Sequence, residues 1–245
     1  MYKVFLPQIS NQIEPYYGLA WANQPLSDID LLKASWFYVW SCKIIKHPTA
    51  QSVPMCKKTL DTSLPKDYSG FMLVFNEPNV SIQDNLTVDQ AVLEYDKIRE
   101  YYPKAKLVVG NVSIFATKWL KDFCARRQLE RVGIHCYEEY YINNAYISDK
   151  LDDLYSTINL PMWVTEFNNI YPDTDKFGRL LDTITSKSYV ERVAPFTNRQ
   201  AGTEWWELPN CDLVDKTGTL TTKGQIYVSQ RKKIGGNVEN GKMVK

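Results

Sequence analysis

Several side chains on which common kinds of site depend are scarce in this sequence. Only two of the 245 residues are histidines, His47 and His135, which excludes a histidine-rich metal site. The five cysteines are odd in number and include no Cys-x-x-Cys pair, so the sequence predicts neither a disulfide framework nor a zinc knuckle. We expect all five to be free thiols.

An excess of charge of one sign is also absent. The 29 Lys and Arg residues face 28 Asp and Glu, a net charge of +1 that gives no electrostatic argument for nucleic acid or for an anionic membrane. No stretch approaches the ~18 consecutive apolar residues that span a bilayer. The opening residues form an apolar stretch too short for a signal peptide and closed by Pro7. We expect a soluble chain, secreted if a leader has been removed and cytoplasmic otherwise.

Two motifs of other enzyme classes are missing as well. No Gly-x-Gly-x-x-Gly turn follows a strand-like run, so the usual nucleotide signature of an open doubly wound sheet is absent. No Gly-x-Ser-x-Gly elbow supplies a nucleophilic serine, and a Ser-His-Asp triad would depend on His135. His135 shares a strand face with Tyr137, and a lone histidine in a strand more often has a structural role than a catalytic one.

The sequence does contain short apolar runs that recur with helical segments between them. Thr87 and Gln90 form a capping-box pattern that opens a helix ending near Tyr101, and apolar spacing predicts further helices over 116–128, 145–157 and 174–187. Such alternation is typical of a parallel sheet covered by helices. We therefore expect an α/β fold, a single (β/α)8 TIM barrel over residues 1–230, followed by a flexible polar tail over 231–245. Eight runs have strand character: 16–21, 33–40, 52–56, 70–76, 106–111, 131–137, 162–167 and 189–196.

Two glutamates stand where the active site of such a barrel would lie. Glu77 and Glu166 each close a strongly apolar run, the fourth and the seventh, and barrel active sites form at the C-terminal ends of the strands. A carboxylate at the end of a buried strand is costly unless it is paired or used. The two could therefore act as an acid and a base in one cleft. The alternative for each is a rim carboxylate bridged to an Arg or a Lys.

Aromatic residues make up 13% of the chain, either as core packing or as a surface for flat ligands with apolar faces, of which sugars are the commonest. Strand alternation puts Trp36, Tyr38 and Trp40 on one face, with Trp40 nearest the mouth of a barrel. Trp21 and the pair Trp205-Trp206 follow the first and the last strand, and we expect them at the same rim.

An ordered set of segments resembles glycoside hydrolase family 128, the small-barrel endo-β-1,3-glucanases of the large clan of (β/α)8 retaining glycosidases. The segments are 18–21, 34–40, 53–55, 75–78, 134–137, 161–167 and 190–192, and together they cover roughly residues 16–228. They include Asn76-Glu77-Pro78 and Thr165-Glu166-Phe167. The sequence departs from the family at Cys136, where a bulky aromatic is expected, and over 195–199.

The resemblance implies a role for each matching residue. Glu77 would be the acid/base and Glu166 the nucleophile, while Asn76 would bond the sugar 2-hydroxyl and Tyr137 would hold Glu166. Because Asn76 and Glu77 are adjacent, both can line one site only if the strand end twists or bulges. Substrate contacts are expected from Asn76, Trp21, Trp40, His135, Tyr137, Trp163 and Trp205.

We therefore expect a monomeric retaining hydrolase of β-glucan, an endo-β-1,3-glucanase that works by double displacement without metal or organic cofactor. Its two carboxyl groups would lie ~5–5.5 Å apart, and a separation of ~10 Å or more would contradict the expectation. Two alternatives stay open. One is a hydrolase of another β-linked glycan, such as a capsule, a cell-wall sugar or a β-1,4 polymer, and the other is a non-catalytic carbohydrate-binding barrel.

Overall fold

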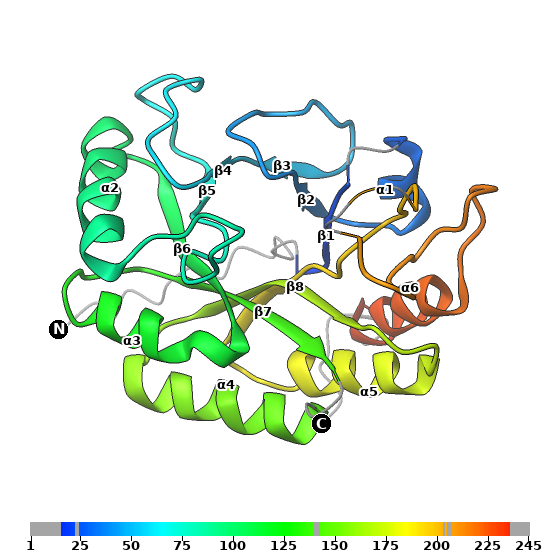
Figure 1. The fold of residues 1–245 in the computed structure, drawn as a ribbon. Coiled ribbons are helices and arrows are strands. Elements are labelled where there is room, and N and C mark those ends of the chain that lie inside the picture. The colour runs from blue at the N-terminus through cyan, green and yellow to red at the C-terminus, as the bar shows by residue number, and fades with distance from the viewer. Residues whose placement is uncertain (1–15, 23–24, 140–142, 203, 205–206, 236–245) are drawn as a thin grey trace, which may run out of the picture.

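Neighbouring strands run parallel, as the alternation of apolar strands and helices predicts (Figure 1). The structure is a computed structural model that describes residues 16–22, 25–139, 143–202, 204 and 207–235. One sheet has the order β1-β2-β3 and the other β4-β5-β6-β7-β8-β9. The strands are β1 (Gly18–Ala20), β2 (Trp36–Tyr38), β3 (Gln51–Val53), β4 (Met55–Cys56), β5 (Phe71–Val74), β6 (Lys106–Ser113), β7 (Val132–Glu138), β8 (Met162–Asn169) and β9 (Val190–Val193).

The two sheets form one ring of eight strand positions. β3 and β4 belong to one chain run that is interrupted at Pro54, a residue without a backbone donor. Its carbonyl nevertheless accepts from the Leu73 N–H at 2.9 Å and so connects the run to β5. At the other seam Tyr17 forms a parallel bridge to Val193, and the last strand thereby meets the first. The expected (β/α)8 fold class is confirmed.

Helices cover the outside of the strands (Figure 1). The capping box at the start of α2 is present, because the Thr87 side chain accepts from the Gln90 N–H and the Gln90 side chain accepts from the Thr87 N–H. The helices expected over 116–128, 145–157 and 174–187 correspond to α3, α4 and α5. The α-helices of the described residues are α1 (Ser27–Leu31), α2 (Val88–Tyr101), α3 (Thr117–Cys124), α4 (Asn144–Ile158), α5 (Thr174–Thr185) and α6 (Thr222–Gly235).

Two connections depart from a complete (β/α)8 pattern. Residues 39–50 after β2 and 57–70 after β4, all of them described, contain no α-helix. Each segment carries a proline, Pro48 or Pro65, which disfavours a helix through its missing donor and its clash with the preceding turn. These long connections leave the strands at the same edge as Glu77, so they are available to shape the site.

The apolar core has two layers, one inside the ring and one between strands and helices. Trp36 and Trp163 are both fully buried inside the ring, with ring centroids 5.1 Å apart. The Arg192 guanidinium lies 4.3 Å from the Trp163 ring, a cation–π contact that helps to accommodate its charge. The outer layer takes the apolar faces of the helices, such as Leu151 and Leu154 of α4. Large aromatic residues therefore fill the interior of the barrel.

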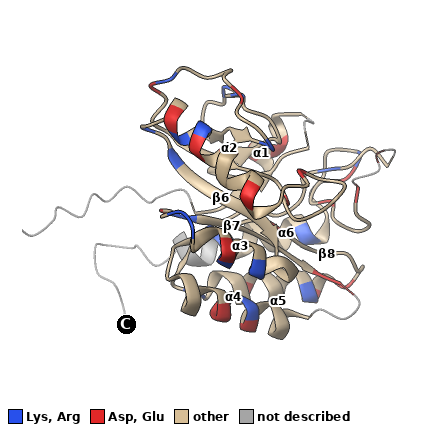
Figure 2. Ribbon diagram, turned by 60° about the vertical axis from the view of Figure 1, so that its left-hand side comes forward, with Lys and Arg blue, Asp and Glu red and all other residues tan. Residues whose placement is uncertain are grey.

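The surface and the C-terminal end complete the fold. Acidic and basic residues are interspersed along α3, α4 and α5 (Figure 2). Within the described part of the chain, no helix is long and apolar enough to cross a membrane. The domain boundary that we expected after residue 230 falls inside α6, which ends at Gly235, and residues 236–245 of the expected tail lie outside the described residues. All five cysteines are free thiols.

Candidate active site

Glu77 follows β5 where the chain leaves the extended conformation. Phe75 and Glu77 have φ angles of 68° and 45°, in the left-handed region that L-residues seldom adopt. The Glu77 N–H donates to the Asn111 carbonyl at 3.0 Å, which holds this turn against β6. Because the turn breaks the alternation of side chains, Asn76 and Glu77 both line one cleft. The expected departure from an ideal strand at this position is confirmed.

Glu166 reaches the same cleft through a β-bulge. β8 continues to Asn169, so Glu166 lies within its strand and does not close it as we expected from the apolar run. The pairing of β7 with β8 passes from Ile134–Val164 to His135–Glu166 and skips Thr165. An extra residue in a strand re-aims the side chain that follows it, and Glu166 thereby turns into the cleft.

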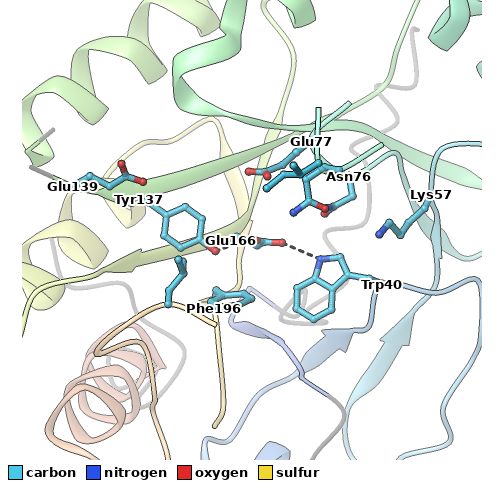
Figure 3. Close-up of a pocket in the computed structure, with 11 residues that line it drawn as sticks. Trp40, Lys57, Asn76, Glu77, Tyr137, Glu139, Glu166 and Phe196 are labelled. Carbon is cyan, nitrogen blue, oxygen red and sulfur yellow. Dashed lines mark hydrogen bonds between the residues drawn. The ribbon is translucent and has the colours of Figure 1, made fainter. Parts of the chain in front are cut away.

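Three donors hold the Glu166 carboxylate, and Figure 3 shows two of them, Trp40 and Tyr137. The Tyr38 hydroxyl and the Trp40 indole N–H donate to Oε1 at 3.0 and 3.1 Å, and the Tyr137 hydroxyl donates to Oε2 at 2.6 Å. An indole nitrogen can only donate, so the arrangement suits an ionised carboxylate that accepts from all three. The expected contact of Tyr137 with Glu166 is present. Tyr38, which the sequence analysis placed on the strand face of Trp40 without a role at the site, is a further partner of Glu166.

His135 lies between the two glutamates and contacts both. Its Nδ1 is 3.1 Å from Glu77 Oε1 and 3.4 Å from Glu166 Oε2. The two oxygens can be no farther apart than the sum of these distances, about 6.5 Å, which excludes the ~10 Å that would contradict a retaining pair. The ring is 1% exposed and its Nε2 has no partner among the described residues. His135 therefore contacts the carboxylates and does not line the cleft, contrary to the substrate contact that we expected.

Burial and charge compete in this group. Burial raises the pKa of Glu166, and the charge of Glu77 adds to the rise. His135 and the hydrogen bonds from Tyr137 and Tyr38 lower this pKa. The raising causes are larger, so the pKa of Glu166 is above its ordinary value. Burial lowers the pKa of His135, but the Glu166 charge and the contact with Glu77 raise it by more. Burial and the Glu166 charge hold the pKa values of Tyr38 and Tyr137 well above the ordinary range, so both hydroxyls keep their protons and donate.

The cleft in front of these groups has a volume of about 430 Å³ and mixes aromatic, apolar and charged walls. Lys57 supplies an ammonium on the side of Trp40 and Asn76, and Glu139 lies beyond Tyr137 (Figure 3). Among the described residues, no group of three or more His, Cys, Asp or Glu side chains could hold a metal ion. The lining residues are Trp40, Lys57, Asn76, Glu77, Ile82, Gln83, Tyr137, Glu139, Glu166, Phe196 and Leu208.

Asn76 is held so that one polar atom stays available. Its backbone N–H donates to buried Asp84 at 2.6 Å, and its Nδ2 donates to Gln83 at 3.2 Å. Its Oδ1 is buried and has no partner among the described residues. An unpaired buried acceptor is costly unless a ligand completes it, so this oxygen points to a donor supplied from the cleft.

The expected tryptophan contacts divide between the cleft and the core. Trp40 lines the cleft, as expected. Trp21 is 5% exposed and packs edge-on against Phe37 at 5.8 Å in the outer core layer, and it is not among the residues that line the cleft. Trp163 stands near the start of β8, three residues before Glu166, and its indole fills the interior of the barrel. Trp205 lies outside the described residues.

The fold and the site together define a glycoside hydrolase: a (β/α)8 barrel whose strand ends bring two carboxylates to one cleft within the separation that glycosidases use. The profile of the family described as "Glycosyl hydrolase catalytic core" matches residues 18–227. The chain belongs to this family. The resemblance to glycoside hydrolase family 128 is confirmed by the solved structures that share its fold.

Three of these solved structures come from three different subgroups of family 128. An endo-β-1,3-glucanase of family 128 subgroup I from Amycolatopsis mediterranei, in complex with laminaritriose, has a TM-score of 0.71 and 21% identity over 88% of this chain and 99% of its own. A subgroup II endo-β-1,3-glucanase from Pseudomonas viridiflava has a TM-score of 0.67 and 26% identity over 88% and 98%. A subgroup VII oligosaccharide-binding protein from Trichoderma gamsii has a TM-score of 0.67 and 17% identity over 91% and 96%.

A curated protein is similar to part of this chain. The anti-sigma-I factor RsgI6 of Acetivibrio thermocellus is 26% identical over an alignment of 150 residues that covers 55% of this chain. The chain spans only 19% of the length of that protein.

Proposed function

We propose that this glycoside hydrolase is a retaining endo-β-1,3-glucanase in which Glu166 is the nucleophile and Glu77 the acid/base. The observation that carries the proposal is the single His135 ring in contact with both carboxylates, which limits the distance between Glu77 Oε1 and Glu166 Oε2 to about 6.5 Å. A retaining pair lies ~5–5.5 Å apart, so that one carboxylate can reach the anomeric carbon while the other reaches the leaving oxygen.

The surroundings of Glu166 support its role as nucleophile. Three hydrogen bonds, which reach both of its oxygens, fix the orientation of the carboxylate. Each donor also favours the ionised form, which is the form that attacks. Burial raises the pKa of Glu166 and so favours its protonated form. The donors are important because they oppose this rise. Tyr38, Trp40 and Tyr137 would thus keep Glu166 ionised and aimed.

Glu77 suits proton transfer because it combines a buried contact with access to the cleft. Its side chain is 18% exposed, compared with 8% for Glu166. In the first step protonated Glu77 would give its proton to the glycosidic oxygen while Glu166 attacks the anomeric carbon, and the leaving sugar departs with a free hydroxyl. In the second step Glu77 would take a proton from water, whose oxygen displaces Glu166 and restores the original configuration.

The assignment of a β-1,3-glucan substrate draws on the related glucanases together with the cleft. The laminaritriose complex of the Amycolatopsis enzyme shows that this fold accommodates such a chain in that protein. In this chain, Trp40 and Phe196 offer aromatic surface, and the free Oδ1 of Asn76 would accept from a sugar hydroxyl. Both carboxylates and their donors come from one chain, which supports action as a monomer.

Two alternatives have their own support. The fold relative from Trichoderma gamsii is described as an oligosaccharide-binding protein, so a barrel of this kind can be a binder. A binder has no need of a second carboxylate held by dedicated donors, which argues for turnover here. The second alternative is cleavage of another β-linked glycan, for which the long connections 39–50 and 57–70 would shape a different groove.

The test is release of reducing sugar from a soluble β-1,3-glucan by the wild type, Glu77→Gln and Glu166→Gln, beside a β-1,4-glucan. We expect the wild type to act on the β-1,3 polymer and both variants to lose at least about a thousandfold in kcat while their melting temperatures stay close to wild type. Activity on the β-1,4 polymer alone would assign the other glycan. Binding of oligosaccharide without any product would favour the non-catalytic alternative.

The two roles can be separated by azide rescue of alanine variants. In Glu77→Ala, azide would attack the glycosyl-enzyme formed on Glu166 and give a β-glycosyl azide. In Glu166→Ala, azide would take the place of the nucleophile, and Glu77 would still protonate the leaving group, so an α-glycosyl azide would form. The opposite pairing of products would exchange the two assignments.

A further inference from the structure

We propose that Asn111 and Thr165 form a buried link that sets the distance between the two carboxylates, and that both are positioning residues of the reaction. Neither lines the cleft. The inference rests on the roles proposed for Glu77 and Glu166, and it concerns how the barrel holds those side chains at a working separation.

Each of the two residues is the extra residue of a β-bulge. The pairing of β6 with β7 passes from Gly110–Gly133 to Val112–Ile134 and skips Asn111. On the other side of β7, the pairing with β8 skips Thr165. Asn111 has a φ of 49°, a left-handed conformation that asparagine tolerates better than most residues. Bulges re-aim side chains, and these two aim theirs at each other.

The two side chains meet across β7. The Thr165 hydroxyl donates to Asn111 Oδ1 at 2.9 Å, and both residues are fully buried. Gly133 of β7 makes room for this contact, because a Cβ at that position would lie 2.0 Å from Asn111 Oδ1. A residue other than glycine would force the Asn111 side chain to move. β6 and β8 are thus joined by a side-chain bond over the strand between them.

Asn111 also holds the turn that carries Glu77. Its Nδ2 donates to the carbonyls of Val74 and Phe75 at 3.1 and 2.9 Å, and its own carbonyl accepts from the Glu77 N–H at 3.0 Å. Every polar atom of the side chain is therefore used. Three of these bonds fix the chain from Val74 to Glu77. Phe75 and Glu77 have positive φ angles, which a strand end without such support would not keep.

The link joins the two carboxylate-bearing segments by a short path. Glu77 is bonded to Asn111 through its backbone, Asn111 to Thr165 through side chains, and Thr165 precedes Glu166 in β8. Catalytic groups need to be held to within ~0.5 Å of their working geometry. Loss of the Thr165 hydroxyl would leave Asn111 Oδ1 buried without its partner, and the relaxation that follows would change the spacing of the two carboxylates.

The test compares Thr165→Val, which keeps the shape and removes the hydroxyl, with Thr165→Ser, which keeps the hydroxyl. On a β-1,3-glucan we expect Thr165→Val to lower kcat about tenfold to a hundredfold with KM changed less than about twofold, because positioning acts on the transition state. Thr165→Ser should recover most of the rate. Thr185→Val is the matched control, since its hydroxyl bonds the Leu181 carbonyl within α5, and it should keep the wild-type kcat.

Gly133→Ala tests the same link from a residue that touches neither carboxylate. We expect it to displace Asn111 and to give the kinetic signature of Thr165→Val, a lower kcat at nearly constant KM. A Thr165→Val enzyme with wild-type kcat and pH profile would overturn the inference. So would a loss of the same size in Thr165→Ser, because the hydroxyl would then have no part in it.

A substrate-independent measurement keeps the inference separate from the proposed function. His135 contacts both carboxylates, so its imidazole titration, followed by NMR, reports on their positions. The link predicts a displaced titration midpoint in Thr165→Val and a wild-type midpoint in Thr185→Val, whichever glycan the enzyme cleaves. An unchanged midpoint in Thr165→Val would overturn the link. Full activity in Glu77→Gln or Glu166→Gln would overturn the proposed function instead.

Discussion

The Tyr137 hydroxyl of β7 donates to Glu166 Oε2 of the adjacent strand β8 at 2.6 Å, although the register pairs Tyr137 with Asn168. The same phenol ring packs edge-on against Phe196 at 6.1 Å on the wall of the cleft. One side chain thus belongs both to the hydrogen-bonded support of Glu166 and to the aromatic surface that faces the substrate. The two contributions can be separated by substitution.

Tyr137→Phe keeps the ring and removes the donor. A hydrogen bond to a charged group is worth about 1.5–3 kcal/mol, so we expect kcat/KM to fall about tenfold to a hundredfold. Without a donor that favours the ionised form, the pKa of Glu166 rises further, and the acid limb of the pH–rate profile should move to higher pH. Steady-state kinetics across pH check both effects. An unmoved acid limb would count against Glu166 as the group that must be ionised.

His135 should make stability depend on pH. Its pKa is raised above the ordinary value of 6.5, so the folded state binds this proton more tightly than the unfolded state. The stabilisation is fully present below that ordinary value and is lost as the pH rises through the higher folded value. Urea unfolding of the wild type and His135→Gln from pH 5.5 upward measures it. We expect the difference in unfolding free energy to shrink with rising pH, and a difference that grows would show the opposite linkage.

The same substitution at two tryptophans should have opposite consequences. Trp163→Phe leaves a gap inside the barrel and removes the indole bond to Glu191, so we expect a loss on the order of 1–3 kcal/mol of stability with kcat and KM close to wild type. Trp40→Phe removes the indole donor of Glu166 at the half-exposed mouth, so we expect a lower kcat with little change in stability. Unfolding curves and kinetics on both variants decide. A large rise in KM for Trp163→Phe would instead indicate that Trp163 contacts the substrate in the cleft.

A buried ion pair ties the chain after β9 to α1. Arg199 bonds both oxygens of Asp28, which is 1% exposed and also accepts from Asn198 at 2.8 Å. Arg199→Leu leaves that carboxylate buried without its cation, and we expect a loss of about 3–5 kcal/mol of stability. The double variant Asp28→Asn with Arg199→Leu should be more stable than the single variant. A double variant that is less stable would mean that packing, and not the stranded charge, accounts for the cost.

The regular part of the fold follows from local patterns in the sequence. Apolar runs and three-to-four-residue spacing locate strands and helices because burial of one face imposes those periods. The capping box at Thr87 marks the start of its helix because its side chain satisfies a free backbone donor there. Glu77 and Glu166 stand out because a carboxylate next to a buried apolar run is costly unless it is paired or used.

The details that assemble the site do not follow from periodicity. A β-bulge adds one residue to a strand without a composition of its own, so the skipped Thr165 and the continuation of β8 to Asn169 leave no signal in the sequence. An apolar run also gives no depth, so it could not correct the resemblance, which put Trp163 near the cleft although the residue stands near the start of its strand. Lys57 and Gln83 come from connections whose paths only tertiary packing decides.

The most direct test of the central claim is the configuration of the first product. Proton NMR in D2O, recorded during the first minutes of hydrolysis of a soluble β-1,3-glucan, distinguishes the anomers before they interconvert. Double displacement through Glu166 predicts that β-configured reducing ends appear first and that the α form follows by mutarotation. An α-configured first product would mean inversion by direct attack of water, and it would contradict the account.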